Sequence, residues 1–127
     1  MPTARELMST DLVTIDGMAT ALDAAKLMAE KHVRALVVER REPKDAYGIV
    51  TQRDVVYKVM ADGTDPASVK VHEIMSKPLV VVNPDLDIRF VARLMRNVGL
   101  SRAPVIGEGR LMGIVSVTDV LKAITQT

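Results

Sequence analysis

The stretch Gly48-Ile49-Val50-Thr51-Gln52-Arg53-Asp54-Val55 returns later in the chain as Gly113-Ile114-Val115-Ser116-Val117-Thr118-Asp119-Val120. Each copy holds a glycine, an apolar pair, a hydroxyl residue, two variable positions, an aspartate and an apolar residue. The Thr/Ser-x-x-Asp step is typical of a capping box at a helix start, and the apolar pair before it is typical of a buried strand. Each copy therefore predicts a strand that passes directly into a helix.

The repetition extends along the whole chain. One constant shift places Met8 on Met75 and Thr20 on Asp87, and both members of the second pair are N-cap residue types. The shift becomes slightly smaller at the twin stretches, because the hairpin at 107–110 is shorter than its counterpart in the first half. A length change confined to a surface hairpin is what a structural repeat tolerates.

Each repeat is predicted to contain a strand, a helix, two strands and a second helix. In the first repeat these are a strand at 12–15, a helix with its N-cap at Thr20, strands at 35–38 and 47–50, and a helix from Thr51 to about Gly63. One such unit of about 55 residues buries too little surface to fold alone. We therefore expect a mixed α/β fold in which repeats 1–63 and 64–127 pack sheet to sheet about a pseudo-twofold axis.

Composition excludes several classes of protein. Lys and Arg number 17 and Asp and Glu 16, so the chain has no strong field for nucleic acid, and its few aromatic residues leave little to stack on bases. The absence of cysteine removes disulfides and thiolate metal sites. No apolar run reaches the length of a membrane span and the N-terminus does not resemble a signal peptide, so we expect a cytoplasmic protein.

Other paired motifs accompany the twin stretches. They are Leu7-Met8-Ser9 with Ile74-Met75-Ser76, Lys26-Leu27-Met28 with Arg93-Leu94-Met95, and the runs 33–38 and 100–106. In this order they resemble a tandem pair of cystathionine-β-synthase-type (CBS) domains, each a β-α-β-β-α repeat, over residues 3–124. One departure is Val37, where the family usually has the proline found here at Pro104.

The resemblance implies a regulatory sensor of adenine nucleotides (AMP, ADP or ATP) rather than an enzyme. No cofactor is required in this interpretation. Two repeats form a disc with two clefts, and discs commonly pair, so a homodimer that signals to an unknown regulated protein is expected. Neither nucleic acid nor membrane is an expected partner.

The resemblance also implies roles for individual residues. In ligand-bound members the motif aspartate holds the ribose hydroxyls, the hydroxyl residue contacts ribose or phosphate, and a basic residue before the middle strand meets the phosphates. The implied nucleotide-binding residues are Thr3, Met8, Val33, Arg34, Thr51, Asp54, Lys70, Met75, Arg102, Ser116 and Asp119. Asp119 is expected to share a cleft with Thr3, Met8, Val33 and Arg102, and Asp54 a cleft with Lys70 or Val71, Met75 and Leu100. We expect the Asp119 cleft to bind more tightly.

Alternatives remain open at this point. The Thr/Ser-x-x-Asp steps can serve only as helix caps, Arg34 and Arg102 can be solvated, and the methionines can be plain core. The chain can also be a ligand-free interaction scaffold, or a sensor of S-adenosylmethionine or NAD, whose adenosyl half is the same. Metal binding is not expected, because His32 and His72 lack the spacing of metal ligands.

Overall fold

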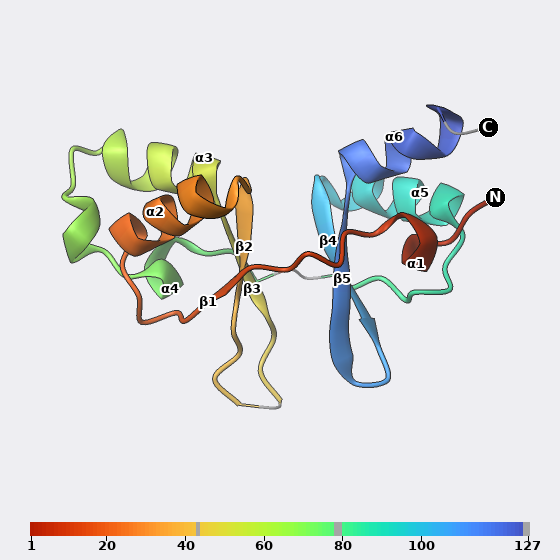
Figure 1. Cartoon of the computed structure of the whole chain (residues 1–127), viewed down its shortest axis with the longest axis horizontal. Helices are drawn as coiled ribbons and strands as arrows, with labels where there is room; N and C mark the ends of the chain where they lie inside the picture. The colour runs from red at the N-terminus through yellow and green to blue at the C-terminus, as the bar shows by residue number, and fades with distance from the viewer. Residues whose placement is uncertain (43, 78–79, 126–127) are drawn as a thin grey trace. The chain divides into compact units, whose positions relative to one another are not determined.

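A computed structural model describes residues 1–42, 44–77 and 80–125 of the chain. Helices and strands are interspersed along this part of the chain (Figure 1), so the predicted mixed α/β class is confirmed. The chain forms two compact units, and each has a hydrophobic core of its own.

The two units have different bounds from the sequence repeats. The middle unit is Val13–Pro78, and the terminal unit combines Met1–Leu12 with Leu79–Thr127. The opening segment of each sequence repeat therefore packs in the unit that contains the strands of the other repeat. We call residues 3–9 and 70–76 the lead-in segments of the terminal and middle units.

The middle unit follows the predicted order of elements. Its elements are β1 (Thr14–Ile15), α2 (Ala21–Lys31), β2 (Ala35–Val38), β3 (Gly48–Thr51), α3 (Gln52–Val55), η1 (Val56–Met60), η2 (Pro66–Ser68) and α4 (Val71–Ile74). The sheet order is β1-β2-β3, with β1 parallel and β3 antiparallel to β2. The register pairs Ala35 with Thr51 at one end of the hairpin and Val38 with Gly48 at the other.

The terminal unit has the same plan with a shorter first strand. Its elements are α1 (Ala4–Leu7), α5 (Ile88–Val98), β4 (Arg102–Gly107), β5 (Arg110–Ser116) and α6 (Val117–Thr125). The first strand is reduced to an isolated parallel bridge between Val82 and Val105. The strands β4 and β5 form an antiparallel pair in which Arg102 lies opposite Ser116.

The predicted helix starts are present. Thr20 and Asp23 exchange two hydrogen bonds of 3.0 Å in a complete capping box, and Asp87 accepts a 2.8 Å bond from the Arg89 N–H. The helix predicted from Thr51 is less regular than expected. It begins as α3 and continues as the π-helical turn η1, whereas its counterpart α6 is α-helical throughout its length.

Candidate functional site

The two motif aspartates cap their helices with almost identical geometry. In the middle unit Asp54 Oδ2 accepts from the Thr51 N–H at 2.8 Å and from the Thr51 hydroxyl at 3.0 Å. In the terminal unit Asp119 Oδ2 accepts from the Ser116 N–H at 2.8 Å and from the Ser116 hydroxyl at 2.9 Å. Each hydroxyl oxygen also accepts from the aspartate N–H at 3.2 Å. The predicted capping role is therefore confirmed in both copies.

The two carboxylates are largely removed from solvent. The Asp119 side chain is 11% exposed and that of Asp54 is 14% exposed. Among the residues that the structure describes, Asp119 is the one buried residue with a polar or charged side chain. A buried carboxylate needs hydrogen bonds to offset lost hydration, and the capping bonds supply them to Oδ2.

A lysine contacts the second oxygen of each carboxylate. Lys58 Nζ lies 3.0 Å from Asp54 Oδ1, and Lys122 Nζ lies 3.4 Å from Asp119 Oδ1. Neither lysine was among the site residues predicted from the sequence. Their i+4 and i+3 spacing from the aspartate is the signal that could have found them, because residues so spaced are neighbours on a helix surface.

The carboxylates keep capacity for a further donor. An ionised carboxylate has about four acceptor positions, two on each oxygen. On Asp119 the Ser116 N–H and hydroxyl take up Oδ2, while Lys122 is the donor to Oδ1 among the described residues. Further hydrogen bonding by either aspartate is therefore concentrated on Oδ1.

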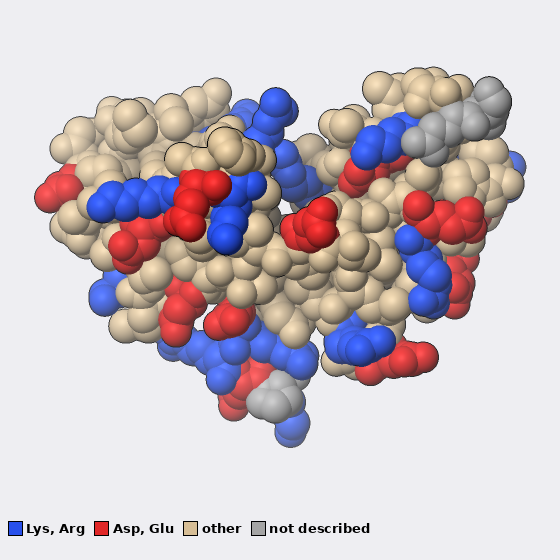
Figure 2. Space-filling model, viewed as in Figure 1, with Lys and Arg blue, Asp and Glu red and all other residues tan. Residues whose placement is uncertain are grey.

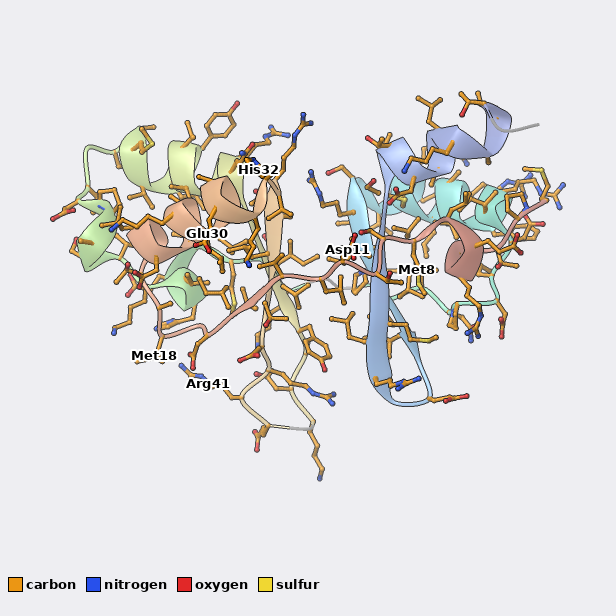
Figure 3. All side chains as sticks on the ribbon, viewed as in Figure 1. Met8, Asp11, Met18, Glu30, His32 and Arg41 are labelled. Carbon is orange, nitrogen blue, oxygen red and sulfur yellow. The ribbon has the colours of Figure 1, made fainter. Side chains whose placement is uncertain are left out.

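The lead-in segments place a methionine against each motif strand. Met8 packs on β5 at Gly113, where an added Cβ would lie 2.7 Å from the Met8 sulfur. Met8 is labelled beside β5 in Figure 3. Met75 packs on β3 at Gly48 in the same way, with 2.6 Å from an added Cβ to the sulfur. Each motif begins with glycine because a methionine sulfur occupies the space of a side chain.

Backbone pairing fixes these segments. Ser9 and Ile114 exchange two hydrogen bonds of 2.8 and 3.0 Å, and Ser76 and Ile49 exchange two of 2.7 and 2.9 Å. The structure therefore brings Met8 into the unit of Ser116 and Asp119. It brings Met75 into the unit of Thr51 and Asp54.

The other expected contacts are distributed between the units. Thr3 precedes α1, where its hydroxyl donates to Glu6 at 3.3 Å, and Lys70 precedes α4 with its backbone bridged to Thr20. Val33 lies in the middle unit and Leu100 in the terminal unit. The grouping of Val33 with Asp119, and of Leu100 with Asp54, joins residues of different units and stays a prediction.

The two arginines occupy unequal positions. Arg102 lies directly opposite Ser116 in the β4–β5 pair, so the two side chains leave the sheet on the same face. Arg34 lies one residue outside β2, and its carbonyl accepts from the Gln52 N–H at 3.1 Å. Within the described residues neither guanidinium forms an ion pair.

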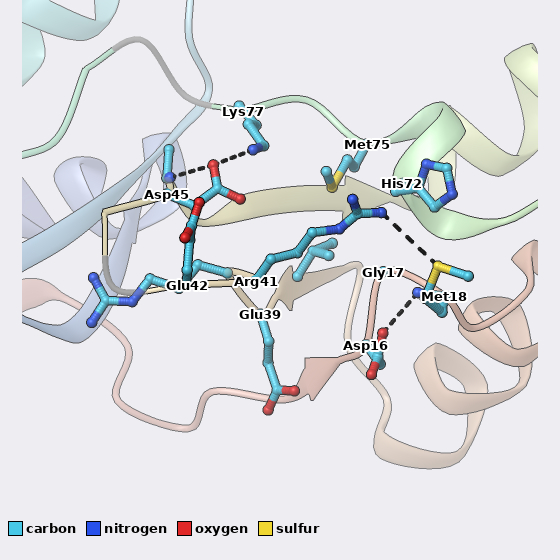
Figure 4. Close-up of a pocket in the computed structure, with 13 residues that line it drawn as sticks. Asp16, Gly17, Met18, Glu39, Arg41, Glu42, Asp45, His72, Met75 and Lys77 are labelled. Carbon is cyan, nitrogen blue, oxygen red and sulfur yellow. Dashed lines mark hydrogen bonds and ion pairs between the residues drawn. The ribbon is translucent and has the colours of Figure 1, made fainter.

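A separate cavity of about 700 Å³ opens in the middle unit (Figure 4). It lies at the Val38–Gly48 end of the hairpin, away from Thr51. Lys77 forms an ion pair with Asp45, and this hydrogen bond lowers the pKa of the Asp45 carboxyl. The lining contains both carboxylates and cations, so the cavity favours no single class of charged ligand.

Two other kinds of site are not found in the described part of the chain. It contains no group of three or more His, Asp or Glu residues placed to hold a metal ion. Nor does any of its helices combine the length and apolar character needed to cross a membrane. On the face shown in Figure 2, basic and acidic side chains are interspersed rather than gathered by sign.

Several known proteins are similar to this chain in sequence and in fold. The chain is similar to the uncharacterized protein MK0525 of Methanopyrus kandleri, with 34% identity over 92% of this chain and 60% of that protein. It is 32% identical to the CBS domain-containing protein YhcV of Bacillus subtilis, over 94% of this chain and 83% of that protein. A solved structure of a hexameric CBS-CP12 protein from bloom-forming cyanobacteria is 54% identical, with a TM-score of 0.88. The similarity covers 94% of this chain and 66% of that one.

The chain therefore spans less than two thirds of MK0525 and of the CBS-CP12 chain. The sequence model of the CBS domain matches twice, at residues 4–61 and 71–126. Proteins with this domain are generally regulatory, ligand-binding modules. The predicted resemblance is confirmed, and the chain belongs to the CBS domain family, with two copies of the domain.

Proposed function

We propose that this CBS pair is a regulatory module that binds an adenine nucleotide (AMP, ADP or ATP). The observation that carries the proposal is the pair of shielded aspartates, each held by a capping hydroxyl and each with acceptor capacity left on Oδ1. A ribose cis-diol offers two O–H donors, and a hydrogen bond from a hydroxyl to a carboxylate is strong because the acceptor is charged. Asp54 and Asp119 are the proposed ribose contacts.

Groups close to the motif aspartates in sequence or in the sheet also support phosphate binding. The start of α6 carries the positive end of the helix dipole, which favours anions. Arg102 leaves the sheet on the face of Ser116 and has no carboxylate partner among the described residues. The half-buried Arg102 is therefore the proposed phosphate contact of the Asp119 site, and the exposed Arg34 that of the Asp54 site.

Transmission of the signal is proposed to use contacts between copies of the chain. The terminal unit has an apolar groove of about 480 Å³ between α5 and α6, bordered by Leu100, Val117 and Leu121. Val117 and Leu121 are 55% and 56% exposed. A homodimer or larger assembly would cover them, and the similar CBS-CP12 protein is hexameric. The cytoplasm is the proposed location, because regulatory adenine nucleotides are found there.

The direct test is titration calorimetry of the chain with AMP, ADP and ATP, repeated with Asp54→Ala, Asp119→Ala and the double variant. We expect binding by the native chain and none by the double variant. Absence of binding by the native chain at millimolar nucleotide would refute the proposal.

A ligand-free scaffold is the second candidate, and the exposed apolar groove favours it. A ligand that binds only the folded state must raise the melting temperature. A scaffold predicts no rise with AMP, ADP, ATP, NAD or S-adenosylmethionine. A rise with only one of the last two would identify a different adenosyl ligand.

A further inference from the structure

Lys58 joins the motif aspartate of the middle unit to its lead-in segment. Its ammonium lies 3.0 Å from Asp54 Oδ1 and donates a 2.9 Å hydrogen bond to the carbonyl of Ile74. Ile74 precedes Met75, which packs on the motif strand at Gly48. One ammonium therefore covers the carboxylate oxygen that the capping hydroxyl leaves available and bridges it to a second element.

We propose that Lys58 is a lock on the Asp54 site, which a ribose must displace before both of its hydroxyls can donate to Oδ1. This inference rests on the proposed function, because it concerns how readily the same site accepts a nucleoside. Binding at Asp54 then includes the loss of two contacts of one ammonium. The affinity of this site for a nucleotide is therefore lower than it would be without Lys58.

The exposure of the two side chains makes the lock both effective and reversible. Asp54 is 14% exposed, so solvent screens its ion pair less than it would a pair at the surface. The Lys58 side chain is 47% exposed and can turn into water without disturbing the core. A displaced ammonium regains hydration, which limits the effect to roughly three- to tenfold in affinity.

The terminal unit lacks an equivalent arrangement. The alignment of the twin stretches places Ala123 at the position of Lys58, and an alanine side chain cannot reach a carboxylate. Lys122 contacts Asp119 from a different position and at 3.4 Å, and among the described residues it has no second acceptor in the lead-in segment. The lock is therefore a property of one site only.

A helical Asp–Lys pair at this spacing also has a purely structural explanation, which is the modest stabilisation of its own helix. The bond to Ile74 argues for more, because that carbonyl belongs to the end of α4. The two explanations differ in nucleoside affinity, which helix stabilisation leaves unchanged.

The test uses the full chain with Asp119→Ala, so that the Asp54 site is read alone. AMP and adenosine are titrated into this variant with and without Lys58→Met. Lys44→Met is the matched control, since it removes one positive charge from the exposed loop between β2 and β3. We expect Lys58→Met to tighten both ligands roughly three- to tenfold and Lys44→Met to change neither. Lys58→Gln repeats the test should Lys58→Met fail to fold.

A second ligand sharpens the result. Adenosine without its 2′ and 3′ hydroxyls does not compete for Oδ1, so its affinity should not respond to Lys58→Met. Unchanged affinity for adenosine would overturn the lock. Weaker AMP binding with unchanged adenosine binding would overturn it too and make Lys58 a phosphate contact. Failure of the native chain to bind any nucleotide would instead refute the proposed function itself.

Discussion

The two units build the same aspartate cap on helices of different regularity. In the terminal unit α6 remains α-helical over its whole length, whereas in the middle unit the short α3 passes into the π-turn η1. The capping hydroxyls lie 3.0 and 2.9 Å from the aspartate Oδ2 atoms, yet the lysine that contacts the aspartate comes from a different position in each unit. The capping step is therefore fixed locally, whereas access to the aspartate depends on the side chains that the rest of the helix carries.

The largest difference between the units is expected in the unfolding free energy lost when each motif glycine is replaced by alanine. A Cβ at Gly113 would lie 2.7 Å from the Met8 sulfur and also 2.7 Å from the backbone oxygen of Ser9. A Cβ at Gly48 would meet the Met75 sulfur at 2.6 Å and next the Val38 Cβ at 3.2 Å. Because backbone yields less than a flexible side chain, Gly113→Ala should cost about 3 kcal/mol of unfolding free energy and Gly48→Ala about 1 kcal/mol. Urea denaturation measures both.

A double-mutant cycle checks the cause of that difference. In the Met75→Ala background, Gly48→Ala should cost much less unfolding free energy than in the native chain, because the sulfur is the main obstacle. In the Met8→Ala background, Gly113→Ala should still cost most of its unfolding free energy, because the carbonyl of Ser9 remains. An equal reduction of the cost in the two units would show that the Ser9 backbone can move.

The second difference concerns nucleotide affinity. Asp119→Ala should remove the tighter class of AMP site and weaken overall binding at least tenfold, or about 1.4 kcal/mol. Asp54→Ala should change the tight class less than threefold. Calorimetry of the two single variants measures this, with thermal melts as a control, since each loses a helix cap of about 1 kcal/mol. A larger effect of Asp54→Ala would reverse the assignment of the tighter site.

Replacing the arginines should also weaken AMP binding more in the terminal unit than in the middle unit, but with a smaller effect than replacing the aspartates. Arg102→Ala should weaken AMP binding about fivefold, because its side chain shares a face with Ser116. Arg34→Ala should weaken it less than twofold, because Arg34 lies outside β2. Adenosine has no phosphate and should bind both variants as it binds the native chain. A loss of adenosine affinity would indicate that the arginine acts on the fold and not on phosphate.

Much of this architecture follows from the sequence because it is local. The capping boxes at Thr20 and Thr51, the order of elements and the repeat were all visible as spacing along the chain. The exchange of lead-in segments between units was not visible as spacing, since it depends on contacts such as that of Ser9 with Ile114, which are distant in sequence. The family resemblance implied it, by grouping Met8 with Asp119 and Met75 with Asp54. The lysine contacts were missed because the repeat alignment places Ala123 and not Lys122 opposite Lys58. A residue that is present in only one of the two repeats is not found by aligning the repeats with each other.

The smallest expected difference is at the capping hydroxyls, where the two units should behave alike. Thr51→Ala and Ser116→Ala each remove one hydroxyl that donates to the aspartate and accepts from its N–H, with closely similar distances in both units. Each should therefore cost about 1 kcal/mol of unfolding free energy. Thr51→Ser keeps the hydroxyl and should cost less than about half of that, which separates the cap from the methyl group. Because the caps are equal, any inequality in nucleotide affinity must come from groups beyond them, namely the lysines and arginines. Unequal losses on urea denaturation would contradict this and place part of the asymmetry in the caps themselves.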